Sequence, residues 1–122
     1  MKQSEYLRYD AVALADLIRR GEVAASDICE AAIERAATVN DKLNAICHPQ
    51  FSDALNQAPT PDSTFSGVPM LLKDLAQEQQ GQPCTYGSRG LKKNIASRDS
   101  EFVRRARAAG LVFLGRTATP EF

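Results

Sequence analysis

One lysine of this sequence, Lys73, stands where a lysine could act as a base. It directly follows the apolar run Val68-Pro-Met-Leu-Leu72, which predicts a short strand buried on both faces. Strand alternation places Lys73 on the side of Leu71, and we expect its side chain to be buried. Burial disfavours the ammonium form, and a neutral lysine amine is a usable general base. The pattern alone favours the alternative, a solvated lysine without a role, because buried lysines are rare.

No serine of the chain stands out as a nucleophile to go with this base. The serines are Ser4, Ser26, Ser52, Ser63, Ser66, Ser88, Ser97 and Ser100. None of them lies in a Gly-x-Ser-x-Gly elbow. Ser26 and Ser100 are placed to cap helices, and Ser88 lies in Gly87-Ser-Arg-Gly90, where a tight turn is favoured over an anion-binding nest.

The histidine and cysteine content argues against a metal centre. His48 is the only histidine, and it precedes Pro49 in a predicted loop, so we expect a structural or surface role for it. The three cysteines, Cys29, Cys47 and Cys84, are odd in number and show no Cys-x-x-Cys spacing. We therefore expect small core residues in a cytoplasmic protein, with no disulfide framework, metal or organic cofactor.

The charge pattern gives no reason to expect binding to nucleic acid or a membrane. Lys plus Arg and Asp plus Glu number 15 each. A locally basic run between residues 89 and 107 contains one aromatic residue, Phe102, which belongs to a predicted core stripe, so a solvated helix face is favoured over nucleic-acid contact. No apolar run approaches the roughly 18 residues that a membrane span requires.

The first half of the chain is predicted to be helical. Asp10 can cap a helix that ends at Gly21, and Ser26 can cap a second helix whose apolar stripe continues to Leu43. Regular structure is expected to break at His48-Pro49, and residues 50–56 are expected to form one further short helix.

The second half predicts a parallel strand–helix–strand unit. Val68–Leu72 and Leu111–Leu114 are short apolar runs, and between them Asp99 or Ser100 can cap a helix that Gly110 ends. This order is typical of an α/β fold. Residues 77–98 are polar and lack a clear period, which predicts a long loop. A sheet of two buried strands needs further strands beside it, so we expect part of the domain to be missing.

Several segments, in order, resemble the amidase signature family. Gly67-Val-Pro-Met-Leu-Leu-Lys-Asp-Leu75 resembles the segment that carries the family's catalytic lysine. The other similar segments are Asp10–Glu22, Glu30–Arg35, Asn40–Ala45, Tyr86–Ser88, Asp99–Arg104 and Leu114–Phe122. The resemblance implies that residues 1–122 form the N-terminal portion of a single amidase domain, with helices packed on a mixed, mainly parallel sheet.

The resemblance also implies a reaction. Enzymes of this family hydrolyse carboxylic amides with a serine nucleophile, a second serine in a cis peptide, and a lysine that takes a proton from this second serine. Lys73 matches the lysine, and no metal or cofactor is needed. The family's two serines would lie beyond Phe122, so we expect this chain to be inactive alone, although its parent would act on a small-molecule amide. Arg116 and Ala118 stand where the family often has Lys and Asn, which puts some substrate contacts in doubt.

Two other functions stay open. One is the subunit of a tRNA-dependent amidotransferase, which shares the amidase fold. The other is a non-catalytic fragment that associates with itself through an uncovered sheet edge and exposed apolar faces. If this chain is stable alone, its uncovered surfaces lead us to expect a homo-oligomer.

Overall fold

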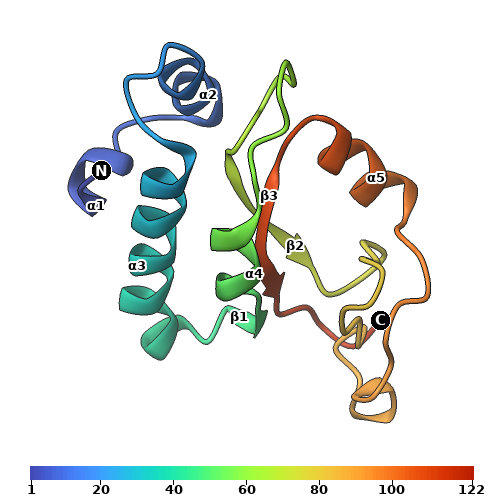
Figure 1. Cartoon of the computed structure of the whole chain (residues 1–122). Coiled ribbons are helices and arrows are strands. Elements are labelled where there is room, and N and C mark those ends of the chain that lie inside the picture. The colour runs from blue at the N-terminus through green and yellow to red at the C-terminus, as the bar shows by residue number, and fades with distance from the viewer.

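The computed structural model describes residues 1–122, which form helices on both faces of a small sheet (Figure 1). In chain order the elements are α1 (Gln3–Tyr6), α2 (Ala11–Arg19), α3 (Ala25–Leu43), β1 (Ile46–Pro49), α4 (Phe51–Asn56), β2 (Pro69–Lys73), the 3₁₀ helix η1 (Arg89–Leu91), α5 (Glu101–Ala108) and β3 (Val112–Thr117). The predicted α/β class is therefore confirmed.

The sheet is mixed, with β3 at its centre. The strand order is β1-β3-β2; β2 runs parallel to β3, and β1 runs antiparallel to it. The predicted strand–helix–strand unit is confirmed as β2, α5 and β3, and β3 continues past the apolar run to Thr117. With one pairing of each kind, the sheet within these residues is mixed rather than mainly parallel.

The core is divided between the two faces of the sheet. On one face, Cys29 and Ala32 of α3 and Ala54 of α4 pack against β3. On the other, Val103 of α5 packs against Leu72. The small side chains of α3 let it lie close to the strands. Each face of β3 is thereby covered, which explains why its sequence is a continuous apolar run.

Strand β1 was not predicted, because the sequence places a proline inside it. The expected break at His48-Pro49 is wrong: both residues belong to β1, and Pro49 lies opposite Gly115 of β3. A proline is tolerated on an edge strand because the ladder hydrogen bond that it lacks is not required there. The pairing shifts between Ile46 and His48, which leaves Cys47 as the extra residue of a β-bulge.

The helix caps follow the sequence with one exception. Ala13 N donates to Asp10 Oδ1 at 2.8 Å, and Val103 N donates to Ser100 Oγ at 3.3 Å, so two predicted caps are confirmed. The predicted cap at Ser26 is wrong, because α3 begins at Ala25 and its N-cap, Ala24, has no side-chain hydrogen bond. Helix α4 confirms the predicted short helix, whereas α1 is a single turn too short to carry an apolar period.

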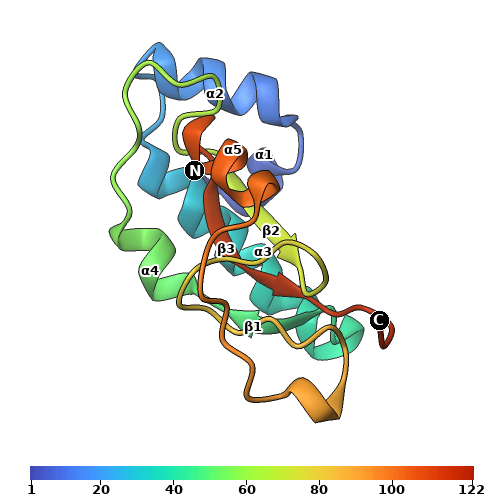
Figure 2. The same cartoon turned by 90° about the vertical axis from the view of Figure 1, so that its right-hand side faces the viewer.

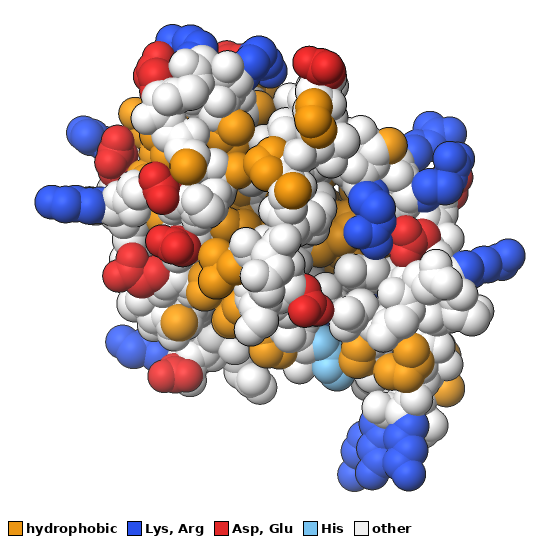
Figure 3. All heavy atoms as spheres, in the orientation of Figure 1, with side chains coloured by type: hydrophobic (Ala, Val, Ile, Leu, Met, Phe, Trp, Pro, Cys, Tyr) orange, Lys and Arg blue, Asp and Glu red, His pale blue; other side chains and the backbone are white.

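The outer edges of the sheet and several apolar side chains are uncovered. No strand within residues 1–122 pairs with the outer side of β1 or β2. The space-filling view shows apolar side chains at the surface between α3 and α4 (Figure 3). None of the helices combines the length and apolar character that a membrane crossing requires. The 77–98 loop lies at the end of the sheet opposite α2 (Figures 1 and 2).

Candidate functional site

Lys73 is the last residue of β2 and lies at the edge of the sheet where β2 and β3 both end. Because the two strands are parallel, their carboxyl ends meet there, and Lys73 is opposite Thr117 in the register. The predicted burial of Lys73 is wrong: its side chain is exposed. The reason is that β2 is an edge strand, so no neighbouring strand covers the end from which Lys73 projects.

The backbone around Lys73 is held by a dense set of hydrogen bonds. Lys73 N donates to Gln77 Oε1 at 2.6 Å, which closes a turn after the strand. Arg116 Nη2 donates to the carbonyl oxygens of Lys73 at 2.9 Å and Gln77 at 2.7 Å. Asp74 N donates to Thr117 O at 3.1 Å. The position of the Lys73 Cα is therefore fixed although its side chain is solvated.

A buried ion pair between Arg116 and Asp74 lies directly beneath this turn. Arg116 Nε donates to Asp74 Oδ1 at 3.1 Å, and the two side chains are 0% and 2% exposed. Thr85 completes the carboxylate's surroundings, donating from its N at 2.9 Å and from its Oγ1. A charge this deeply buried is stable only when it is paired and hydrogen-bonded. The pair therefore fixes the strand ends to the 77–98 loop.

Sequence reasoning missed this pair. It treated Arg116 as a departure that affects substrate contacts, whereas in the structure its hydrogen bonds all go to the chain itself. The sequence did offer a signal, because Asp74 and Arg116 each follow a predicted strand by two residues. Parallel strands bring such ends together. Ala118 is exposed, and its backbone N donates to Ala45 O at 2.7 Å.

His48 and Cys47 of β1 lie beside Asp74. His48 Nε2 is 3.8 Å from Asp74 Oδ2, and Cys47 Sγ donates to Arg116 O at 3.5 Å. The expected core position is confirmed for Cys29 and Cys84, but Cys47 is exposed. Burial of the sulfur, with the nearby Asp74 charge second, raises the pKa of the Cys47 thiol. A cavity of about 310 Å³ opens next to these residues.

The 77–98 loop is tied to the last residues of the chain. Phe122 N donates to Tyr86 O at 2.8 Å, and Ser88 Oγ donates to Glu121 Oε1 at 2.6 Å. Ser88 also accepts from Gly90 N at 3.3 Å, so the predicted tight turn is confirmed. Tyr86 Oη donates to Glu78 Oε1, and this hydrogen bond raises the pKa of Tyr86 to about 12 and lowers the pKa of Glu78.

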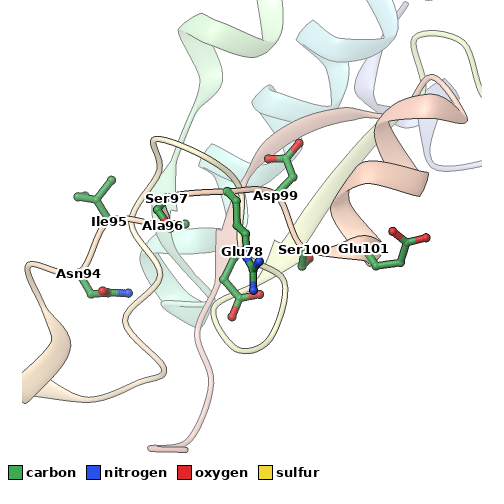
Figure 4. Close-up of a pocket in the computed structure, with 9 residues that line it drawn as sticks. Glu78, Asn94, Ile95, Ala96, Ser97, Asp99, Ser100 and Glu101 are labelled. Atoms are coloured by element: carbon green, nitrogen blue, oxygen red, sulfur yellow. The ribbon is translucent and has the colours of Figure 1, made fainter.

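A surface hollow of about 580 Å³ is lined by Glu78 and residues 94–101 and does not include Lys73. Figure 4 shows that its carboxylates do not converge: those of Asp99 and Glu101 point away from Glu78. Each is already engaged, Asp99 by Arg107 and Glu101 by Arg104 and Arg105. This hollow is therefore a solvated surface depression without an assembled set of reactive groups.

The basic residues of this region belong to the solvated surface, as predicted. Three arginines of α5, Arg104, Arg105 and Arg107, are exposed and paired with Glu101 or Asp99. Figure 3 shows Lys and Arg side chains around the rim of this face, with one group at the tip of the loop at lower right. Within residues 1–122 the hydrogen bonds of Lys73 involve its backbone N and O, not its side chain.

The mixed α/β fold agrees with the family that the sequence resembles. The family model described as Amidase matches residues 27–122. The chain belongs to this family, the amidase signature enzymes.

Its relatives are much longer proteins. A 6-aminohexanoate-cyclic-dimer hydrolase from Paenarthrobacter ureafaciens is 42% identical over 114 residues, which cover 92% of this chain and 23% of the relative. A glutamyl-tRNA(Gln) amidotransferase subunit from Salinispora tropica is 37% identical over 123 residues, with 93% and 25% covered. The chain thus spans about a quarter of the length of these relatives.

Solved structures agree with this assignment. A structure of 6-aminohexanoate cyclic dimer hydrolase complexed with substrate superposes with a TM-score of 0.85 at 41% identity, covering 93% of this chain and 24% of that one. A fatty acid amide hydrolase superposes with a TM-score of 0.89 at 21% identity, covering 98% and 22%, which supports the fold alone.

Proposed function

We propose that residues 1–122 supply the lysine base of an amide hydrolase of the Ser-cisSer-Lys type, and that this lysine is Lys73. The observation that carries the proposal is the position of Lys73 at the carboxyl end of β2, in a segment similar to the one that holds the family's catalytic lysine. The reaction is the hydrolysis of a carboxylic amide to a carboxylic acid and an amine, with one water consumed and no cofactor or metal required.

In this proposal the base works through a proton relay. Neutral Lys73 takes the proton of a bridging serine, which takes the proton of the nucleophilic serine as that serine attacks the amide carbon. One proton is returned through the relay to the amine as the carbon–nitrogen bond breaks, which leaves the acyl group on the nucleophilic serine. Water, deprotonated by the same relay, then attacks the acyl carbon and releases the carboxylic acid and the free serine. Neither serine is assigned within residues 1–122, so these residues alone are expected to have no hydrolytic activity.

The exposure of Lys73 is consistent with that expectation. A lysine in water is held as ammonium, and it becomes a base at neutral pH only when surrounding atoms exclude solvent. Within residues 1–122 the Lys73 side chain is exposed. Activity therefore requires further polypeptide that supplies both the serines and the cover over the amine.

The substrate proposed is a small aliphatic amide in a cytoplasmic enzyme. The 42% identity to a hydrolase of the 6-aminohexanoate cyclic dimer makes that compound the first substrate to try. The similarity to a glutamyl-tRNA(Gln) amidotransferase supports a second candidate, hydrolysis of the glutamine side-chain amide for transfer to a tRNA-linked acid. The two candidates differ in the amide that is hydrolysed, so measuring hydrolysis of both amides separates them.

The test compares three forms of the protein that contains this segment: unaltered, Lys73→Ala and Lys42→Ala. Lys42 is an exposed lysine in the last turn of α3 and serves as the matched control. The new amino group that appears when the cyclic dimer is opened and the ammonia released from glutamine are measured separately. We expect Lys73→Ala to abolish the turnover that Lys42→Ala retains. Full activity of Lys73→Ala would refute the assignment of the base, and hydrolysis of neither amide would refute the proposed substrates.

A further inference from the structure

Three side chains with metal-ligating atoms meet beside the buried ion pair. Cys47 and His48 come from β1, and Asp74 follows β2; their sulfur, nitrogen and oxygen atoms lie within 4.8 Å of one another. The expectation of no zinc site rested on local sequence spacing, in which one histidine and scattered cysteines form no motif. Asp74 comes from a separate strand, so the sequence alone could not show this cluster.

The β-bulge explains how two consecutive residues reach the same place. Adjacent side chains of a regular strand point to opposite faces of the sheet. Because Ile46 pairs with Thr117 and His48 with Arg116, Cys47 is the extra residue and the alternation is interrupted there. Bulges of this kind redirect a side chain and are frequent beside functional sites.

Asp74 has one acceptor position to spare. A carboxylate offers about four acceptor positions, two on each oxygen. Oδ1 accepts from Arg116 Nε and Thr85 N, while Oδ2 accepts from Thr85 Oγ1 only. The free position belongs to Oδ2, the oxygen that His48 Nε2 faces at 3.8 Å. That separation is too long for a direct hydrogen bond.

The distances and the ligand types suit zinc. Two nitrogen or oxygen ligands at tetrahedral angles around Zn²⁺ lie about 3.4 Å apart, given bond lengths of roughly 2.0–2.1 Å. The 3.8 Å between His48 Nε2 and Asp74 Oδ2 is close to that separation. Cys47 Sγ, which donates to Arg116 O at 3.5 Å, would give up this hydrogen bond to bind the metal. A mixed sulfur, imidazole and carboxylate set favours Zn²⁺ over Mg²⁺ or Ca²⁺, which prefer oxygen alone.

We propose that Cys47, His48 and Asp74 form a three-ligand site for Zn²⁺ whose fourth position opens into the adjoining cavity of about 310 Å³. Arg89 and Lys92 line the same cavity. Their positive charges weaken binding of a free cation and favour a negatively charged fourth ligand, such as hydroxide or a small carboxylate. The site is separate from the amide hydrolysis proposed for Lys73 and does not depend on it.

The test is metal titration of the full chain, with Cys47→Ala, His48→Ala and, as matched control, Cys29→Ala. Cys29 is a buried cysteine in α3 and does not line this cavity. Zn²⁺ affinity is measured by competition with a chromogenic chelator, and Co²⁺ is added separately to look for the near-ultraviolet absorption of cobalt bound to thiolate. We expect one equivalent of metal to bind to the unaltered chain and to Cys29→Ala.

Each ligand variant should weaken Zn²⁺ binding by more than about 10-fold, the smallest loss seen when even a supporting group is removed. The cobalt–thiolate absorption should vanish in Cys47→Ala and persist in Cys29→Ala. The proposal is overturned if no saturable equivalent of Zn²⁺ binds. It is equally overturned if Cys47→Ala or His48→Ala keeps the affinity of the control. None of these results bears on the role of Lys73.

Discussion

Removal of the Arg116 guanidinium should destabilise the fold more than loss of any exposed arginine. In Arg116→Ala the Asp74 carboxylate stays buried, at 2% exposure, with only the Thr85 hydrogen bonds left to it. The carbonyl oxygens of Lys73 and Gln77 lose their donor at the same time. Breaking a buried pair by removing one partner costs about 3–5 kcal/mol. A domain is stable by only about 5–15 kcal/mol, so the loss removes a large fraction of that stability.

Arg104→Ala provides the matched control. Arg104 also pairs with a carboxylate, Glu101, at 2.6 Å, but the two side chains are 69% and 54% exposed. An exposed pair of this kind contributes about 0–1 kcal/mol. The intermediate variant Arg116→Lys keeps the charge but not the forked geometry, and should lose about 1.5–3 kcal/mol, the worth of one hydrogen bond to a charged group.

The assay is equilibrium unfolding in urea, with the free energy of unfolding compared among the three variants and the unaltered chain. The predicted order of destabilisation is Arg116→Ala, then Arg116→Lys, then Arg104→Ala. If Arg116→Ala and Arg104→Ala agree within about 0.5 kcal/mol, the usual limit for surface substitutions, the buried pair does not stabilise the fold as argued.

Three further predictions concern the strand pairing, the loop and the sheet edges. In Gly115→Ala the new Cβ would lie 2.4 Å from His48 O, whereas in Gly21→Ala, also at positive φ, it meets nothing within 4 Å. The free energy of unfolding in urea should therefore fall by about 1–3 kcal/mol more in Gly115→Ala than in Gly21→Ala. Equal losses in the two variants would show that the contact does not matter. The tyrosinate absorbance titration should show a phase near pH 12 that disappears in Tyr86→Phe. Because the folded pKa of Tyr86 lies above its ordinary 10.0 and that of Glu78 below its ordinary 4.5, the stability from this hydrogen bond should be full between these values. This stability should be lost as pH rises through about 12 or falls below 4.5. If the unaltered chain and Tyr86→Phe differed in free energy of unfolding by the same amount at every pH, the prediction would be wrong. The chain should self-associate through the open edges of β1 and β2; a monomer by light scattering at high concentration would count against this.

The sequence predicted best where one local pattern determines the outcome. Two apolar runs located β2 and most of β3, and the cap at Ser100 located α5, because these signals depend only on neighbouring residues. It failed at β1, where edge pairing overrides the proline. It also failed at Arg116 and Asp74, which are 42 positions apart and meet only because the register of two strands brings them together.

The prediction for Lys73 separates two physical questions that a sequence pattern combines. Alternation along a strand tells which side a residue faces, and the strand end and its lysine were located correctly. Whether a side chain on that side is buried depends on which residues pack over the edge of the sheet, and alternation gives no information about them. Burial was therefore an inference about missing neighbours, and within residues 1–122 those neighbours do not exist.

The role proposed for Lys73 has two requirements, a fixed position and a neutral amine, and residues 1–122 provide the first. Its position is set here, since Arg116 and Gln77 bond to both backbone groups of Lys73 without help from any other segment. Its neutral amine would have to be produced by atoms that exclude water, because hydrogen bonds to a backbone do not desolvate a side chain. It follows that Arg116→Lys in an active protein should lower the rate by displacing Lys73 and should leave the pH dependence of the rate unchanged. If Arg116→Lys instead shifted the pH profile and left the rate at its optimum unchanged, this division of roles would be wrong.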